Sequence, residues 1–204
     1  MTKFRFYAIK LSGIIIIVFL LQRFFNGFTE LFVLNHRSFV EVWRFFTAIF
    51  LHGGAVHLFY NLFALVLFGS ILERLIGSRN FLVLFFATGI LANIISVNFY
   101  ESSLGASGAI FGVIGALIFV RPGQMVWAFG LPMPIFIAGI LWAVGDVIGI
   151  FMPRNVANIA HLSGMFFGIV LGALYKSREG KRRELKVEID EGAVRKWERS
   201  FLGG

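Results

Sequence analysis

The chain has 204 residues, of which 58% are hydrophobic, 17% are aromatic and only 15% are charged. Soluble domains contain about 45–50% apolar and about 25% charged residues, so this composition excludes a soluble globular protein and indicates a membrane protein. The absence of cysteine excludes disulfides and thiolate chemistry. The net charge of +8 is concentrated near the two ends of the chain, and the C-terminal end also carries acids. Membrane topology therefore explains the charge better than binding to nucleic acid.

Six apolar segments follow one another along the chain. A helix needs roughly 20 mostly apolar residues to cross about 30 Å of hydrocarbon. We expect transmembrane helices at about residues 6–25, 56–76, 81–100, 106–120, 135–151 and 158–175. The last three segments are short or rich in glycine, which is typical of helices packed inside a bundle. The sequence therefore predicts an all-α membrane protein with six transmembrane helices.

The positions of the basic residues orient these segments in the membrane. Lys and Arg accumulate on the cytoplasmic side of membrane proteins, and here they cluster at both termini and in the turns that share their side. We therefore expect both termini to be cytoplasmic. Residues 26–55 are too apolar for a free loop, and we expect short amphipathic helices in the outer interface. The predicted division is a membrane core at 1–176 and a basic, solvated and partly disordered cytoplasmic tail at 177–204.

The second segment carries two polar residues at its beginning. His57 and Asn61 are four residues apart, so they share one face of a helix. One interpretation is that they only satisfy each other or a neighbouring helix. Polar groups at bilayer depth are costly, however, and often mark a working site. Both interpretations remain open from these two residues alone.

A serine opens the fourth segment and a histidine opens the sixth. Ser107 lies in the run Gly105-Ala106-Ser107-Gly108, where it could serve only as a helix N-cap. His161 lies beside a stripe of glycines spaced by four, which includes Gly164 and Gly168. Small residues let helix backbones approach closely, so we expect the sixth segment to pack against the glycine face of the fourth. That contact would bring Ser107 and His161 within hydrogen-bond distance.

A hydrolase that attacks through an activated hydroxyl needs at least a serine and an adjacent base such as histidine. We expect Ser107 as the nucleophile and His161 as the general base. The developing oxyanion would take hydrogen bonds from the Ser107 backbone N–H, the Asn61 amide and the His57 ring. No carboxylate is expected to complete a triad, because Asp146 is assigned to capping or bracing the fifth segment. The predicted arrangement is a Ser-His dyad.

Taken together, these motifs resemble those of the rhomboid intramembrane serine proteases. The family has a Gly-x-Ser-Gly motif at the start of the fourth of six core helices, which matches Gly105 to Gly108. Its Ala-His-x-x-Gly motif in the sixth helix matches Ala160 to Gly164. Three further family motifs have counterparts in His57 to Asn61, Trp43-Arg44 and Glu73-Arg74. The resemblance covers about residues 41–172 and implies a six-transmembrane-helix rhomboid-like bundle.

The resemblance also implies the roles of the site residues. Ser107 and His161 would be catalytic, and His57, Asn61 and the Ser107 amide would form the oxyanion hole. Where the family commonly has a tyrosine stacked on the catalytic imidazole, this chain has Phe111, so stacking should persist without the hydroxyl. The implied substrates are single-pass membrane proteins, cut near the outer membrane boundary. We expect an integral protein of the cell membrane, whose site opens to the non-cytoplasmic side because its residues fall near the outer ends of their segments. We expect no cofactor or metal.

Two other classes of function remain as alternatives. A metal or proton transporter could use His52, His57 and His161, although no intramembrane acid is expected near them and no His-Glu-x-x-His motif is present. A non-catalytic rhomboid-like protein that binds transmembrane helices is the other alternative. It differs from the protease in predicting that Ser107 is dispensable.

Overall fold

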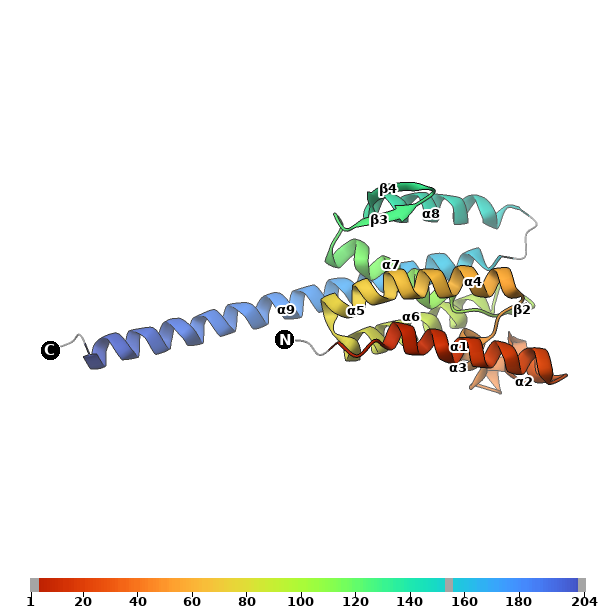
Figure 1. Ribbon diagram of the computed structural model, residues 1–204, viewed down its shortest axis with the longest axis horizontal. Helices are drawn as coiled ribbons and strands as arrows, with labels where there is room; N and C mark the ends of the chain where they lie inside the picture. The colour runs from red at the N-terminus through yellow and green to blue at the C-terminus, as the bar shows by residue number, and fades with distance from the viewer. Residues whose placement is uncertain (1–3, 153–155, 202–204) are drawn as a thin grey trace.

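The computed structural model describes residues 4–152 and 156–201, and most of them lie in helices (Figure 1). Within these described ranges, four helical stretches are long and apolar enough to cross a membrane: Tyr7–Phe24, Ala55–Ile76, Ser78–Ser96 and Asn158–Arg178. The first of these is α1 (Tyr7–Phe24) and the third is α6 (Ser78–Ser96). The chain is thus a helical, integral membrane protein, as predicted.

Two further apolar helices are shorter than a full span. They are α7 (Ser107–Val120), with 14 residues, and α8 (Ile135–Ile150), with 16 residues. At about 1.5 Å per residue they measure about 21 and 24 Å, less than the roughly 30 Å of a hydrocarbon core. Both coincide with predicted segments, and the count of six membrane spans stays a prediction.

The second long stretch is built from three pieces in one continuous rod. These are α4 (Ala55–Ala64), a π-helical piece η3 (Leu65–Gly69) and α5 (Ser70–Ile76). Gly77 then adopts a positive φ of 83° and starts α6 at once. A left-handed backbone is easy for glycine and costly for other residues, which explains why such a short turn is possible here.

The Glu73 side chain of α5 caps the N-terminus of α1. Its carboxylate is fully buried and accepts hydrogen bonds from the backbone N–H groups of Arg5, Tyr7 and Ala8, at 3.3, 3.0 and 3.1 Å, and from the Ser78 hydroxyl at 2.5 Å. The first N–H groups of a helix have no partner within the helix. Glu73 supplies those partners, so it ties α1 to the turn between α5 and α6.

Residues 26–55 form the short helices that the sequence predicts, together with a strand that it does not. The elements are α2 (Phe28–Phe32), β1 (Leu34–Asn35), η1 (His36–Phe39), α3 (Arg44–Thr47) and η2 (Ala48–Phe50). β1 pairs antiparallel with β2 (Ser102–Ser103). The buried Arg44 guanidinium donates to the carbonyls of Glu30 and Val33, at 2.7 and 2.9 Å, and to the Glu41 carboxylate. Arg44 therefore holds this segment in a fixed shape.

A β-hairpin joins α7 to α8, and it was not predicted from the sequence. Its strands are β3 (Met125–Ala128) and β4 (Leu131–Pro134), and they pair in register from Met125 opposite Pro134 to Ala128 opposite Leu131. The two turn residues, Phe129 and Gly130, both have positive φ, as a type I′ hairpin turn requires.

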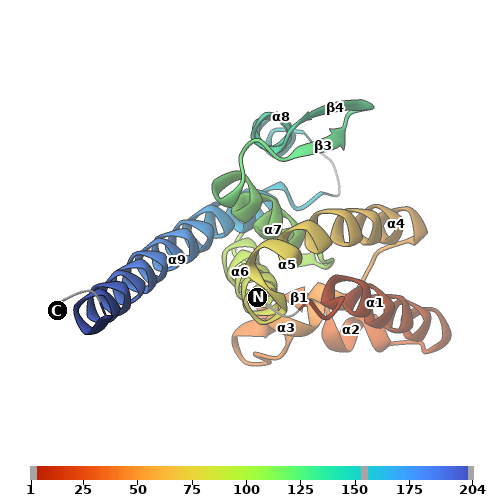
Figure 2. The same cartoon turned by 60° about the vertical axis from the view of Figure 1, so that its left-hand side comes forward.

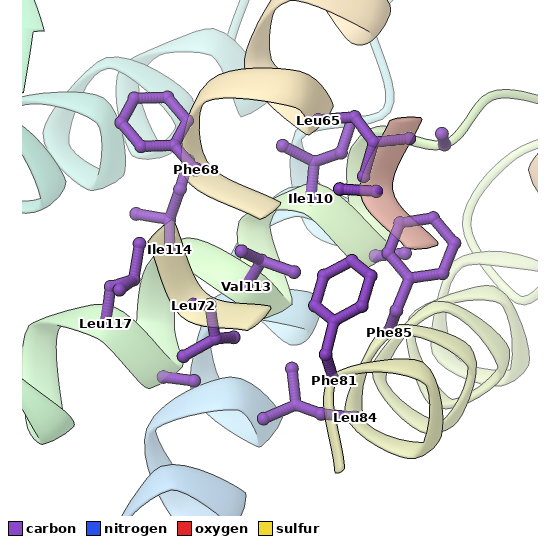
Figure 3. Close-up of a cluster of buried hydrophobic side chains, with 14 of the residues drawn as sticks. Leu65, Phe68, Leu72, Phe81, Leu84, Phe85, Ile110, Val113, Ile114 and Leu117 are labelled. Atoms are coloured by element: carbon purple, nitrogen blue, oxygen red, sulfur yellow. The ribbon is translucent and has the colours of Figure 1, made fainter. Parts of the chain in front are cut away.

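Helix α7 lies at the centre of the bundle. Figure 2 shows it between α9 (Asn158–Phe201) and the rod of α4 and α5, and its most extensive contacts are with α9. The apolar core beside it comes from η3, α5, α6 and α7 (Figure 3). It includes Leu65, Phe68, Leu72, Phe81, Leu84, Phe85, Ile110, Val113, Ile114 and Leu117.

The predicted glycine contact between α7 and α9 is present. A Cβ atom added to Gly164 would lie 2.0 Å from the Gly108 carbonyl oxygen, and one added to Gly168 would lie 2.0 Å from that of Gly112. From the other side, a Cβ on Gly115 would lie 2.2 Å from the Met165 oxygen. No side chain fits at these positions, so the two backbones touch directly.

The described part of the tail is helical, and the expectation that the tail is partly disordered stays a prediction. Helix α9 continues without a break to Phe201 and extends well beyond the other helices (Figure 1). Residues 177–201 are rich in Lys, Arg and Glu and contain no proline, and these three residue types favour helices. Residues 1–3 and 202–204, at the ends of the predicted core and tail, lie outside the described residues. The boundary at 176 stays a prediction.

Candidate active site

Ser107 is the first residue of α7, two residues after a glycine that the fold requires. Gly105 has a φ of 127°, and a Cβ there would lie 2.8 Å from Cε1 of His57. Both the backbone conformation and the space therefore demand glycine. The consequence is that the His57 ring lies against the loop that leads into Ser107.

His161 is the fourth residue of α9, and its ring reaches the serine. The distance from His161 Nε2 to Ser107 Oγ is 2.9 Å. This is a good hydrogen-bond distance for a nucleophile and its base. The glycine contact explains why two residues 54 positions apart meet, since Gly164 of α9 touches the backbone of Gly108, the residue after the serine.

Phe111 lies flat against the His161 ring. The two ring centroids are 4.3 Å apart and the planes differ by 8°. Phe111 follows Ser107 by one helical turn, so the same face of α7 carries the hydroxyl and the ring that supports the imidazole. The geometry matches the stacking that was expected of this residue.

The other ring nitrogen of His161 has a carboxylate partner, and here the sequence-based expectation was wrong. Asp146 Oδ1 lies 3.0 Å from His161 Nδ1. We expected Asp146 only to cap or brace the fifth segment, with no carboxylate near the histidine. The buried residues of α8 are Ile135, Ala138, Gly139 and Asp146. Their spacing puts Asp146 on the buried face of α8, near the end of that helix, where α8 meets the start of α9.

His57 lies against the loop before the serine, and Asn61 lies one turn further along α4. Asn61 Nδ2 donates to the His57 carbonyl at 2.9 Å, which uses one of its two N–H groups. Asn61 Oδ1 is buried and has no hydrogen-bond partner among the described residues. Asn61 thus keeps one amide N–H for another acceptor, and the assignment of both residues to an oxyanion hole stays a proposal.

His52 lies just before α4, next to His57, and the centroids of the two imidazole rings are 5.0 Å apart. It is 2% exposed, and its Nδ1 lies 3.3 Å from the Phe50 carbonyl oxygen. Burial, and secondly the neighbouring His57, lower the pKa of His52 from 6.5 to about 4. His52 is therefore neutral at physiological pH. In the described part of the chain, no three His, Asp or Glu side chains form a group able to hold a metal ion.

The site as a whole is a linear chain of hydrogen bonds from a carboxylate through an imidazole to a hydroxyl. The contacts of Ser107 and Phe111 with His161 were predicted from the sequence, and the contact of the carboxylate was not. A signal was available, because Asp146 follows Gly139 by seven residues and precedes Gly149 by three. A Cβ on Gly139 would lie 2.2 Å from the Ile118 side chain, and one on Gly149 would lie 2.7 Å from that of Asn158. These glycines mark the packed face of α8.

The amino-acid sequence is similar to a known protein family. Residues 40–178 match the Rhomboid domain. The chain is 37% identical over 134 residues to "Rhomboid protease GluP" of Bacillus subtilis, which covers 65% of the chain and 26% of that protein. It is 35% identical over 144 residues to "RHOMBOID-like protein 1" of Arabidopsis thaliana, covering 68% and 36%. It is 32% identical over 145 residues to "Putative rhomboid protease YdcA" of Bacillus subtilis, covering 70% and 71%.

The chain thus spans about a quarter and about a third of the length of the first two relatives, and most of the third. The matched region contains the serine, the histidine, the aspartate and the phenylalanine described above. A match over more than half of the chain, together with the helical membrane fold, leads to one conclusion: this protein belongs to the rhomboid family.

Proposed function

We propose that this protein is an intramembrane serine endopeptidase that hydrolyses peptide bonds in or near transmembrane segments. The observation that carries the proposal is the 2.9 Å contact between Ser107 Oγ and His161 Nε2. Relatives named as rhomboid proteases support the same activity. A serine hydroxyl is a weak nucleophile on its own, and an adjacent imidazole base is the usual means of activating it.

The reaction proceeds in two halves. Ser107 Oγ attacks the scissile carbonyl carbon while its proton passes to His161 Nε2, and the tetrahedral intermediate carries the negative charge on the former carbonyl oxygen. His161 then gives the proton to the leaving amine, so the C–N bond breaks and an acyl-serine remains. A water molecule attacks the acyl carbon, its proton passes to His161, and the serine departs with that proton.

The negative charge of the intermediate needs hydrogen-bond donors. We assign this role to the Ser107 backbone N–H, the His57 ring and the remaining N–H of Asn61. The Ser107 N–H belongs to the first turn of α7, where backbone N–H groups have no partner in the helix. The position of the His57 ring against Gly105 supports its inclusion. Preorganised donors of this kind are usually the largest single contribution to acyl-transfer catalysis.

The proposed substrates are single-pass membrane proteins, and the proposed location is the plasma membrane with both termini in the cytoplasm. His57, Ser107 and His161 lie near the starts of α4, α7 and α9, and Asp146 lies near the end of α8. These four positions are at one end of the bundle, opposite the end from which the basic tail extends (Figure 1). Basic residues favour the cytoplasmic side, which supports a site that opens to the non-cytoplasmic side.

A cleavage assay with purified protein in liposomes tests the proposal. A panel of single-pass substrates is incubated with the enzyme, and the products are identified by mass spectrometry. We expect defined cuts near one membrane boundary, which disappear in Ser107→Ala and in His161→Ala. Ser163→Ala, a serine change two residues after His161, is the matched control and should cleave normally. Substrate binding without cleavage by the wild-type protein would contradict the proposal and favour the non-catalytic alternative.

A further inference from the structure

Asp146 is a buried carboxylate with one polar partner among the described residues. It is 8% exposed, its Oδ1 lies 3.0 Å from His161 Nδ1, and its Oδ2 is buried without a hydrogen-bond partner among the described residues. A buried carboxylate is costly unless it is paired. Within the described part of the chain, the hydrogen bond that compensates this burial comes from the ring that also contacts the proposed nucleophile. A side chain needed only to hold α8 in place would not require a charge at this point.

The stacking of Phe111 on His161 does not make the hydrogen bond between Asp146 and His161 redundant. Stacking between Phe111 and His161 fixes the plane of the imidazole, since the two planes differ by only 8°. It does not fix rotation of the imidazole within that plane, because a stacked ring makes similar contact at every such angle. It also does not choose which nitrogen carries the proton. The hydrogen bond to Asp146 sets both properties.

We propose that Asp146 is a positioning residue that completes an Asp-His-Ser array. Its carboxylate accepts the Nδ1–H of neutral His161, so Nε2 is left unprotonated and directed at the Ser107 hydroxyl. When Nε2 takes the serine proton, both ring nitrogens carry a proton, and the carboxylate stabilises the resulting positive charge while remaining ionised itself. This inference rests on the proposed protease function. It adds a carboxylate to what sequence reasoning described as a dyad.

The Asp146→Asn variant tests this role because the amide has nearly the same size and shape. If the amide oxygen faces Nδ1, the charge is lost and the amide N–H₂ takes the place of Oδ2, which has no hydrogen-bond partner in residues 4–152 and 156–201. If the N–H₂ faces Nδ1, it forces the proton onto Nε2, which then cannot accept from Ser107. In both orientations we expect kcat to fall on the order of 10²- to 10⁴-fold, with KM within about threefold of the wild type.

A small fluorophosphonate probe separates this role from a purely structural one. The probe reacts with an activated serine and does not need a transmembrane substrate to bind. We expect its rate of reaction with Ser107 to fall in Asp146→Asn by a factor similar to that for kcat. The matched control is Asn158→Ala, which removes another polar side chain, 6% exposed, that packs against α8 at Gly149. This control should label at close to the wild-type rate.

One labelling result would overturn the proposal, namely labelling of Asp146→Asn within about threefold of the wild-type rate. If cleavage of membrane substrates is slow in the same variant, Asp146 is assigned to substrate access or to helix packing. Failure of the wild-type protein both to label and to cleave is a different result, because it would contradict the proposed function itself.

The protonation of His161 tests the inference without any loss-of-function variant. Nitrogen-15 NMR of protein labelled at histidine distinguishes the Nδ1–H form of imidazole from the Nε2–H form, and a His161→Gln sample assigns the signals. We expect the neutral His161 of the wild type to be in the Nδ1–H form. A neutral ring in the Nε2–H form would overturn the proposal, whether or not the protein is an active protease.

Discussion

The Phe111 ring and the His161 imidazole lie face to face, 4.3 Å apart and within 8° of parallel. Phe111 stands one turn after Ser107 on α7, so a single helix supplies both the hydroxyl and the surface that orients its base. This relationship makes the distance between α7 and α9 critical for the chemistry. The imidazole must stack on Phe111 and at the same time bring its Nε2 within hydrogen-bond distance of the Ser107 hydroxyl.

Removing the stacked ring should lower activity without abolishing it. An aromatic pair contributes about 0.5–1.5 kcal/mol beyond its area, which corresponds to about a 2- to 10-fold loss of kcat for Phe111→Ala. Phe111→Tyr keeps the ring and should retain near-normal kcat. Steady-state cleavage of one substrate by all three proteins measures this. A Phe111→Ala enzyme at the full wild-type rate would show that stacking does not orient the base.

A side chain in the glycine contact should separate the helices. In Gly168→Val, the new Cβ would meet the Gly112 carbonyl oxygen at 2.0 Å, and backbone cannot give way as a flexible side chain can. We expect a loss of stability at or above the roughly 1–3 kcal/mol of ordinary overpacking, together with loss of cleavage. Gly145→Ala is the control, because no atom of the residues that the structure describes lies within 4 Å of the added Cβ. A stable, active Gly168→Val protein, judged by thermal unfolding and cleavage, would refute this contact.

Glu73 should matter for stability and not for chemistry. In Glu73→Gln, one carboxylate oxygen that accepts from the start of α1 becomes an N–H₂ group facing N–H donors. Leaving buried donors unsatisfied costs about 1–3 kcal/mol, so the unfolding temperature should fall while kcat per folded molecule stays the same. The matched control is the exposed Glu30, whose change to Gln should alter neither quantity. A Glu73→Gln protein as stable as the wild type would contradict the capping role.

His52 should make stability depend on pH. Its pKa is lowered from 6.5 to about 4 in the folded state, so between these values only the unfolded state gains a proton. The free energy of unfolding is therefore highest above pH 6.5 and falls as the pH drops towards 4, with no further loss from this group below that. The loss between pH 7 and pH 5 should be about 2 kcal/mol. His52→Gln should remove this part of the pH dependence, and an unchanged slope in that variant would contradict the assignment.

Much of the fold could be predicted because apolar length and charge placement determine helices in a membrane. Five of the six expected segments coincide with helices to within a few residues, and the sixth coincides with the beginning of a longer one, α9. The glycine stripe of α9 correctly predicted its partner helix, because only very small residues allow backbones to touch. The hairpin of β3 and β4 was not predicted, since its strands contain two prolines and lack a clear alternation of apolar and polar residues.

The site was only partly predictable for a related reason. Ser107 and His161 stand beside dense glycine runs, which show the face that each helix presents to the other. Asp146 lies in a helix whose other residues are almost all apolar, so hydropathy alone does not distinguish its buried face. The contact between Asp146 and His161 joins two helices across a connection that includes residues 153–155, which lie outside the described residues. Local sequence does not determine the angle between those helices.

The most direct test of the central claim is the chemical adduct formed on the wild-type protein. After reaction with a fluorophosphonate, peptide mass spectrometry locates the modified residue. We expect a single adduct at Ser107, formed rapidly in the wild type and lost in His161→Gln, because the serine needs the imidazole to become nucleophilic. An adduct on another serine, or labelling of Ser107 at the same rate without His161, would contradict catalysis by this pair.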